Sequence, residues 1–297
     1  MYSRAAGAAV VASLFVTAPA TAGSRSYVFT EVDVPGGTTT QAFGINGTGQ
    51  IVGFYGTNSG GQLGFVKSRR QYSAINPPFS DMKNEAATGI NDSREIVLYY
   101  QDKSSIHGFL YSRLGNFFRI DALFSGTSNT FAYGINDAGK IVGIYQIPDS
   151  GDHGFLFDRG KFVSIDVPFA GAVSTAALGI NKSGKIVGFY TDSFSVSRRT
   201  RGYVKDGSIF TPIDVPFAGA VDTGVLGINS RGEVVGYYDD NSSLPAHGFV
   251  NVHGSFTSID VPSAASTVVE GINDSGEITG YYRDATGRVH GFVATPR

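Results

Sequence analysis

Short apolar runs alternate with turn-forming residues along the chain from residue 26 onward. One representative unit begins at Gly179 and contains four runs, the later ones being Ile186–Tyr190, Arg201–Val204 and Phe210–Pro216. The runs are rich in β-branched and aromatic residues, and turn residues such as Asp206-Gly207 separate them. No run is long enough for a helix, and apolar positions do not recur at a spacing of 3.6 residues. The pattern therefore predicts short β-strands joined by turns.

The tripeptide Gly-Ile-Asn opens six copies of this unit. The copies begin at Gly44, Gly89, Gly134, Gly179, Gly227 and Gly271, so successive starts lie 45, 45, 45, 48 and 44 residues apart. Four strands in each repeat of roughly 40 to 50 residues are typical of a propeller blade. We therefore predict an all-β fold, a six-bladed β-propeller with four antiparallel strands per blade, and number its blades in chain order.

The turn after Gly-Ile-Asn has a defined chemistry. Sequences such as Asn136-Asp-Ala-Gly139 combine side chains that accept local backbone hydrogen bonds with a glycine that adopts positive φ. Blade two has Arg94 at the glycine position, so we expect strain or a different turn there. The fourth run, Phe-x-x-Ile-Asp-Val-Pro, does not alternate cleanly, and Pro212 lies inside one copy. We expect this outer strand to be bulged or half-exposed.

The first 22 residues have the features of a secretory signal peptide. Arg4 precedes the apolar run Ala8–Ala18, which is too short to span a bilayer, and Ala20-Thr-Ala22 offers a small-x-small cleavage site. The alternative, a short lipid anchor, lacks a cysteine to carry the lipid. We expect residues 1–22 to be the signal peptide, residues 23–297 to form one propeller domain, and the protein to be secreted or periplasmic, with no membrane-spanning segment after cleavage.

The two ends of the repeat array complement each other. Residues 26–35 read as a fourth strand that precedes the first Gly-Ile-Asn, whereas the last repeat ends at Arg297 without a fourth strand. Pairing the first strand with the last repeat would leave no blade with a bare edge. We therefore expect the N-terminal strand to complete blade six and close the ring.

Composition narrows the class of protein. Forty glycines and 22 phenylalanines suit many tight turns and an aromatic core, and the absence of cysteine excludes disulfides and is common in exported bacterial proteins. The formal charge is −2, and charged residues of both signs are mixed along the chain. We therefore expect no nucleic-acid partner.

The repeat resembles the family of exported bacterial proteins with HAF repeats, named for a His-Ala-Phe tripeptide after a Gly-x-Asn…Gly-x-x-Val-Gly segment. The matching tripeptides have Gly in place of Ala in every copy: His107-Gly-Phe109, His153-Gly-Phe155, His247-Gly-Phe249 and His290-Gly-Phe292. Blade one has Leu63-Gly-Phe65, and blade four has Arg201-Gly-Tyr203. The resemblance covers nearly all of residues 23–297 and implies an exported repeat protein, without an activity that can be carried over.

Histidine and an Asp or Asn recur at two positions of the repeat. Four of the five histidines open the tripeptides above, and the acidic position is held by Asp33, Asn76, Asp121, Asp166, Asp214 and Asp260. Such pairs could act as acid–base dyads. A catalytic pair is needed once, however, so we expect the repeated pairs to be scaffold hydrogen bonds, and we expect the lone His253 to be solvated.

Metal and catalytic signatures are weak. Each Asn-Asp-x-Gly turn offers one carboxylate at most, which favours turn chemistry over calcium, and Tyr238–Ser242 is the remaining calcium candidate. The sequence has no Gly-x-Ser-x-Gly, His-Glu-x-x-His, phosphate loop or cysteine nucleophile. We expect no cofactor and no metal.

A ligand site is expected where the repeat is broken on the face that carries the variable loops. The candidate ligand-binding residues are the basic loop residues Arg198, Arg199 and Arg201, the neighbouring Asp222, Asp239 and Asp240, and two residues that precede Gly-Ile-Asn, Tyr133 and Glu270. The loop charges could instead form an inter-blade salt bridge.

Two functions follow from these features. The first is an exported, non-catalytic binding module that uses the loop-rich face to hold a protein, a glycan or a small molecule, and that we expect to be a monomer. The alternative is a hydrolase or lyase at the channel mouth, with Glu270, Glu85, Tyr133 and the blade-four arginines as acid, base and anion stabiliser. A fold alone does not choose between them, but two carboxylates, or a carboxylate and an arginine, meeting in one pocket would favour the enzyme.

Overall fold

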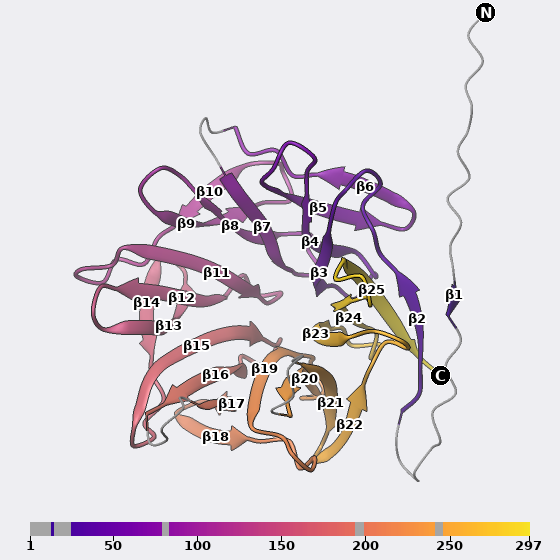
Figure 1. Ribbon diagram of the computed structural model, residues 1–297. Coiled ribbons are helices and arrows are strands. Elements are labelled where there is room, and N and C mark those ends of the chain that lie inside the picture. Colours follow the sequence, from indigo (N-terminus) through magenta and orange to yellow (C-terminus); the bar gives the residue numbers. More distant parts are fainter. Residues whose placement is uncertain (1–12, 15–24, 79–82, 194–198, 241–245) are drawn as a thin grey trace, which may run out of the picture.

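The computed structural model describes residues 13–14, 25–78, 83–193, 199–240 and 246–297, and these form a ring of six β-sheets (Figure 1). The predicted signal peptide lies outside the described residues except for β1 (Ser13–Leu14), which pairs with the outer strand of blade six. The signal peptide therefore stays a prediction. The described residues contain no helix with the length and hydropathy that crossing a membrane requires.

Each blade has four antiparallel strands, as predicted, and β1 adds a fifth strand to the sheet of blade six. Blade one consists of β3 (Thr40–Ile45), β4 (Ile51–Gly56), β5 (Gln62–Ser68) and β6 (Gln71–Ala74). Blade two consists of β7 (Lys83–Ile90), β8 (Ile96–Gln101), β9 (Ile106–Tyr111) and β10 (Phe117–Ile120). Blade three consists of β11 (Asn129–Ile135), β12 (Ile141–Ile147), β13 (Gly151–Asp158) and β14 (Lys161–Ile165). Blade four consists of β15 (Ala172–Ile180), β16 (Ile186–Asp192), β17 (Arg199–Asp206) and β18 (Ile209–Ile213). Blade five consists of β19 (Asp222–Ile228), β20 (Val234–Asp239), β21 (His247–Val252) and β22 (Ser255–Ile259). Blade six consists of β23 (Ser266–Ile272), β24 (Ile278–Arg283), β25 (Val289–Pro296) and β2 (Tyr27–Glu31).

The N-terminal strand closes the ring, which confirms the expectation from the two chain ends. β2 pairs antiparallel with β25, with Tyr27 opposite Pro296 and Glu31 opposite Phe292. The first and last parts of the described chain are therefore hydrogen-bonded within one sheet.

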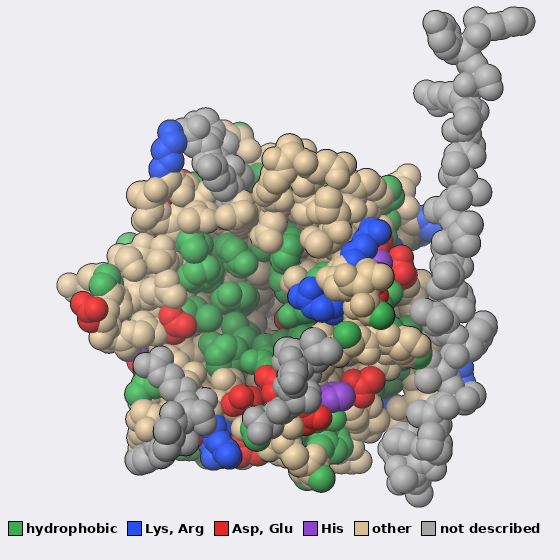
Figure 2. All heavy atoms as spheres, viewed as in Figure 1, with side chains coloured by type: hydrophobic (Ala, Val, Ile, Leu, Met, Phe, Trp, Pro, Cys, Tyr) green, Lys and Arg blue, Asp and Glu red, His purple; other side chains and the backbone are tan. Residues whose placement is uncertain are grey.

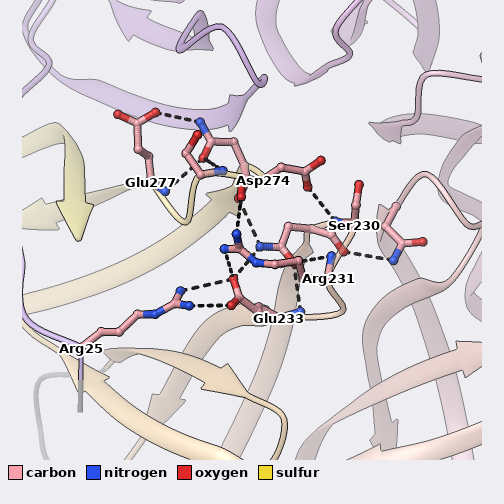
Figure 3. A network of polar contacts seen from close by, with 10 residues as sticks. Arg25, Ser230, Arg231, Glu233, Asp274 and Glu277 are labelled. Carbon is pink, nitrogen blue, oxygen red and sulfur yellow. Dashed lines mark hydrogen bonds and ion pairs between the residues drawn. The ribbon is translucent and has the colours of Figure 1, made fainter. Parts of the chain in front are cut away.

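An ion-pair cluster fastens this N-terminal strand to blade five (Figure 3). Arg25 donates to both carboxylate oxygens of Glu233, at 2.7 and 3.3 Å, and Arg231 donates to the same carboxylate at 2.7 Å. The Glu233 side chain is 2% exposed. Burial alone would raise the pKa of Glu233, but the hydrogen bonds from Arg231, Arg25 and Asn229 outweigh it and lower the pKa to about 2.

The core lies between the blades. The third residue of each His-Gly-Phe tripeptide, or its Tyr203 counterpart, is among the most buried side chains (Phe65, Phe109, Phe155, Tyr203, Phe249 and Phe292). Clusters join neighbouring blades, as where Val52 of blade one packs with Leu98 of blade two. Burying one such side chain stabilises the fold by about 1.5–3 kcal/mol.

The outer strands are half-exposed, as predicted, but the bulges lie elsewhere. Three of the five residues of strand β14 are exposed, and so are three of the five residues of β18, Pro212 among them. The register shifts instead in the first strand of every blade, next to the glycine of Gly-Ile-Asn, for example between Ala132 and Gly134. The bulge therefore lies in the first strand of each blade, the strand that lines the channel.

The turn of blade two has the same hydrogen bonds as the others. Arg94 N donates to Asn91 O at 3.0 Å, as Gly139 N does to Asn136 O. Arg94 has φ +65°, a left-handed conformation that disfavours a residue with a side chain. Of the two expected outcomes, strain occurs and a different turn does not.

Candidate functional site

The channel contains a cavity of about 270 Å³, which we call the cup. Its wall includes a ring formed by the residue before each Gly-Ile-Asn, one from every blade: Phe43, Thr88, Tyr133, Leu178, Leu226 and Glu270. Second strands add Tyr99, Ile144, Phe189 and Tyr281, and Gln41 completes the wall. In Figure 2 the centre of the ring is hollowed and surrounded by hydrophobic side chains.

The cup narrows toward the Gly-Ile-Asn glycines. A Cβ atom on Gly134 would lie 2.6 Å from the carbonyl oxygen of Leu178 and 3.3 Å from the Cα of Gly179 in the next blade. Neighbouring first strands therefore approach so closely that only glycine fits between them. This requirement explains why glycine precedes Ile-Asn in all six repeats.

Six asparagines link the blades at this narrow end of the channel. Each asparagine donates from Nδ2 to the backbone oxygen of the asparagine in the next blade, at 3.0–3.2 Å (Asn46, Asn91, Asn136, Asn181, Asn229 and Asn273). The last of them, Asn273, donates back to Asn46, so the hydrogen bonds form a closed ring. The wide end of the cup therefore lies toward the face that carries the variable loops.

Glu270 is an isolated acid in the wall of the cup. Within the described residues it has neither a hydrogen bond nor an ion pair, and the cup wall contains no Lys, Arg or His. Its side chain lies deep in the molecule and is reached through the cavity, and burial raises its pKa to about 8. At neutral pH the Glu270 side chain is therefore mostly a protonated carboxylic acid.

Tyrosines surround this acid. Burial raises the pKa of Tyr99, Tyr133, Tyr237 and Tyr281, and the charge of Glu270 adds to each shift. For Tyr237 the pKa reaches about 12. These phenols stay neutral at physiological pH, and the three that line the cup, Tyr99, Tyr133 and Tyr281, can offer hydroxyl donors and ring faces to a ligand.

The histidine–aspartate pairs are scaffold, as expected. His153 Nδ1 lies 2.8 Å from Asp166, His247 Nδ1 lies 2.8 Å from Asp260, and His290 Nδ1 lies 2.7 Å from Asp33. His107 bridges Asp121 and Asp102 at 3.0 and 3.1 Å. A tyrosine from the second strand of the same blade packs against each ring. The same arrangement in four blades ties the second, third and fourth strands together.

Arg201 takes the place of histidine in blade four. Its Nε donates to Asp192 at 3.0 Å and its Nη1 to Asp214 at 2.8 Å. Asp192 follows the start of its second strand by the same interval as Asp102 does in blade two. Arg201 thus bridges, within blade four, the two acids that are equivalent to those bridged by His107 in blade two. Asp240 holds the corresponding position in blade five and lies 3.6 Å from His247 Nε2.

The other predicted loop residues lie around blades four and five, away from the cup wall. Arg198 lies outside the described residues, and Arg199 is exposed at the start of β17. Asp222 accepts from the Thr200 amide of blade four at 2.6 Å and pairs in register with Asp239. Burial is the main cause that raises the pKa of Asp239, and the charge of Asp222 adds to it. Of the eight predicted residues, the structure brings Tyr133 and Glu270 together in one cavity.

Glu85 occupies a position that holds threonine in the other five blades. There the hydroxyl oxygen accepts from a backbone amide that follows the preceding fourth strand, at 3.0–3.3 Å (Thr40, Thr130, Thr175, Thr223 and Thr267). In blade two the residue that would donate is Pro77, which has no N–H. Both oxygens of Glu85 are buried and have no hydrogen bond of normal geometry; burial raises the pKa of Glu85 to about 8, although the nearby Gly64 amide lowers it in part.

Three groups of residues that include acids could suggest a metal. Ligand atoms of Glu31, Asp33 and His290 lie within 4.8 Å of one another, but His290 is already bonded to Asp33. The turn aspartates accept from a backbone amide of the preceding blade, as where Asp137 of blade three accepts from the Asp92 amide of blade two at 2.9 Å. Of the calcium candidate Tyr238–Ser242, Asn241 and Ser242 lie outside the described residues.

Sequence reasoning missed most of the cup wall. Phe43, Tyr99, Phe189 and Tyr281 were not predicted, although Phe43 holds the same repeat position as Glu270. Aligning the six repeats on Gly-Ile-Asn would have found the first-strand ring. The same alignment would also have found the second-strand residues, but only once it is known that the second strands reach the channel as well.

No family model matches the chain, and no curated sequence is similar enough to serve as a relative. Solved structures share the fold. AofleA from Arthrobotrys oligospora has 12% identity over 91% of this chain and 86% of its own, with a TM-score of 0.54. The Aleuria aurantia lectin in complex with Fucα1-6GlcNAc has 12% identity over 86% of this chain and 91% of its own, with a TM-score of 0.53. The β-propeller domain of the Trilobed protease from Pyrococcus furiosus has 13% identity, coverage of 91% and 84%, and a TM-score of 0.53. At these identities the likeness shows the fold alone.

Proposed function

We propose that this protein is a non-catalytic binding module that holds a small molecule in the cup. The observation that carries this proposal is a cavity of about 270 Å³ with aromatic and aliphatic walls and one unpaired carboxyl group. Ligand sites in proteins are typically concave and mainly apolar, with a few placed polar groups. The cup has these properties, and residues of all six blades hold it in place.

The loop residues are proposed as the rim of this site. Asp222, Asp239 and Asp240 come from the loop-rich end of blade five, and Arg198 and Arg199 from the adjoining blade-four loop. We propose that these groups attract or select a ligand as it enters. Arg201 is bound to Asp192 and Asp214, so its role in the proposal is to hold the blade.

A thermal-shift screen of amines, sugars and small anions tests this function. A ligand present at a hundred times its Kd stabilises the protein by about 2.7 kcal/mol, which is readily measured. Each hit is then repeated with Leu226→Trp, which fills the cup, and with Val163→Trp, on the exposed outer strand of blade three, as the matched control. Hits that disappear with Leu226→Trp and persist with Val163→Trp support the cup. Hits that survive Leu226→Trp place the site elsewhere and overturn the proposal.

Catalysis at the channel mouth is the alternative. Glu270 could act as a general acid near neutral pH because its pKa is raised to about 8. The described wall of the cup supplies no second carboxylate and no arginine, so the pair that we required of an enzyme does not meet there. Turnover of any substrate that requires Glu270 would favour this alternative.

Export and family membership are part of the proposal. The signal-like residues 1–22 and the His-Gly-Phe repeats support an exported protein of the HAF-repeat type. A glycan ligand is compatible with the fold, since the Aleuria aurantia lectin is a propeller solved with a fucosylated sugar. A sugar would need several polar partners, however, and the Thr88 hydroxyl in the cup wall already donates to backbone oxygens.

A further inference from the structure

The carboxyl group of Glu270 is not required by the propeller scaffold. The other five blades hold Phe, Thr, Tyr, Leu and Leu at the same repeat position, and all six first strands form the same bulged pairing. A buried carboxyl group without a hydrogen bond destabilises a fold. A group of this kind that faces a cavity is therefore better explained by a ligand than by structure.

Aromatic side chains occupy much of the remaining wall. Phe43, Tyr99, Tyr133, Phe189 and Tyr281 come from five different blades and all line the cup. The face of an aromatic ring carries partial negative charge and attracts cations within about 6 Å. Rings on several sides and one carboxylate form the kind of cage that suits an alkylated ammonium group.

The charges near the cup also favour a positively charged ligand. Asp152 acts on Tyr133, Asp222 and Asp239 act on Tyr237, and Arg283 is the cation that acts on Tyr281. Among the charges that act on these three tyrosines, three carboxylates against one guanidinium favour a positive ligand within the cup, below the rim that carries Arg199. A metal ion fits less well, because calcium and magnesium require several oxygen ligands and the cup wall has one carboxyl group.

We propose that the cup binds a small organic cation, a protonated or quaternary amine, with its charge against the Glu270 carboxylate and its alkyl groups against the rings of Tyr99, Tyr133 and Tyr281. This inference rests on the proposed binding function and specifies its ligand class. The balance of charge is simple: Glu270 releases its proton to solvent as the cation enters.

Binding of a fixed cation is therefore coupled to pH. The neighbouring titratable groups are Tyr99, Tyr133, Tyr237 and Tyr281, and burial raises the pKa of each above its usual value. Glu270, with a pKa of about 8, is thus the group that titrates near neutral pH among them. Affinity should rise about tenfold per pH unit below pH 8 and level off above it.

The test compares choline with its uncharged analogue of the same shape, 3,3-dimethylbutan-1-ol, by calorimetry at about pH 8.5 and about pH 6. We expect choline to bind at least about tenfold more tightly than the alcohol at the higher pH, and to lose on the order of 50-fold at the lower pH. Glu270→Gln should remove both the preference and the pH dependence. Asp206→Asn, which removes an exposed acid on the outer hairpin of blade four, is the control of equal charge and should change neither.

A second pair of variants keeps the test independent of Glu270. Tyr133→Phe retains the ring and should bind choline nearly as the original protein does, whereas Tyr133→Leu should weaken binding about tenfold. Equal binding of choline and the alcohol would overturn the cation inference and leave the cup as a binding site. Binding of neither would also overturn it, and the Leu226→Trp screen would then decide separately whether the cup binds anything.

Discussion

Glu270 and Tyr133 hold the same repeat position in blades that lie opposite each other in the ring, and both side chains line one cavity. The two side chains therefore line the channel from opposite sides. The charge of Glu270 contributes to the raised pKa of Tyr133. The channel therefore has a polar group on each of two opposite sides, within walls that are otherwise mostly apolar.

Replacing Glu270 by leucine, the residue of blades four and five, should stabilise the protein. The folded pKa of about 8 exceeds the unfolded value of 4.5, so the folded state keeps a proton that the unfolded state has lost between these values. Stability from this group therefore falls as pH rises from 4.5 to about 8. Urea unfolding should show that Glu270→Leu adds on the order of 1–3 kcal/mol, most of it above pH 8. A gain of equal size at pH 5 and pH 9 would contradict the raised pKa.

Glu85 should behave similarly, although it lies outside the cup wall. Glu85→Met replaces a buried, unpaired acid by an apolar side chain of similar length and should stabilise by about 1–4 kcal/mol above pH 8. The matched control is Thr130→Val at the same repeat position of blade three. Thr130 accepts from the Ala122 amide at 3.0 Å, so this variant should instead lose about 1–3 kcal/mol. Changes of the same sign in both variants would show that Glu85 has a partner.

The ion-pair cluster of Figure 3 should make stability depend on acid pH. The pKa of Glu233 is lowered to about 2 from 4.5, so its contribution is complete above pH 4.5 and is lost as pH falls toward 2. Glu233→Gln should lose about 1–3 kcal/mol at pH 7 and much less near pH 2. Asp284, with a pKa lowered to about 2, titrates in the same window, so the difference between variant and original protein is the quantity to measure.

Arg25→Ala separates the closure of the ring from the local cluster. Arg231 and Asn229 remain hydrogen-bonded to Glu233 in this variant. The decrease in the free energy of unfolding should therefore be smaller than for Glu233→Gln. Hydrogen exchange should show faster opening of β2 than of β25. Unchanged exchange in β2 would show that the strand pairing alone holds the N-terminal strand.

The asparagine ring should contribute to stability in every blade. Asn136→Ala removes the bond to Asn181 O at 3.0 Å and the bonds that Asn136 Oδ1 accepts from Ala138 and Lys140 amides. We expect a loss of about 1–3 kcal/mol in thermal or urea unfolding. Asn136→Asp, which keeps the acceptor and replaces the donor, separates the two contributions and should recover part of the loss. A loss as large as that of Asn136→Ala would show that donation to the next blade dominates.

Arg201 distinguishes a structural role from a role in binding. Because Arg201 bridges Asp192 and Asp214, Arg201→Ala should lower stability by about 1 kcal/mol without changing ligand binding. Arg201→His should restore part of the loss, since histidine makes this bridge in blade two. Arg199→Ala, at an exposed neighbour, should leave stability unchanged. Ligand binding that is lost in Arg201→Ala at unchanged stability would favour the loop site instead.

The architecture could be predicted from the sequence because its determinants are local and repeated. Each Gly-Ile-Asn copy carries its own turn chemistry and strand pattern, and the unpaired strand near the N-terminus matches the repeat that lacks one. The histidine–aspartate scaffold followed from the same logic, since identical pairs in several blades indicate structure.

The cup was decided by tertiary structure. Its wall residues are separated by about one repeat each in sequence, and they meet only because six first strands converge on one axis. The sequence singled out Tyr133 and Glu270 before Gly-Ile-Asn, but it did not show that Tyr99, Phe189 and Tyr281 of the second strands reach the same space. Glu85 is likewise isolated because its missing donor, Pro77, belongs to the preceding blade. Local patterns thus determine strands and turns, whereas the burial and pairing of a charge depend on side chains that closure of the ring brings together.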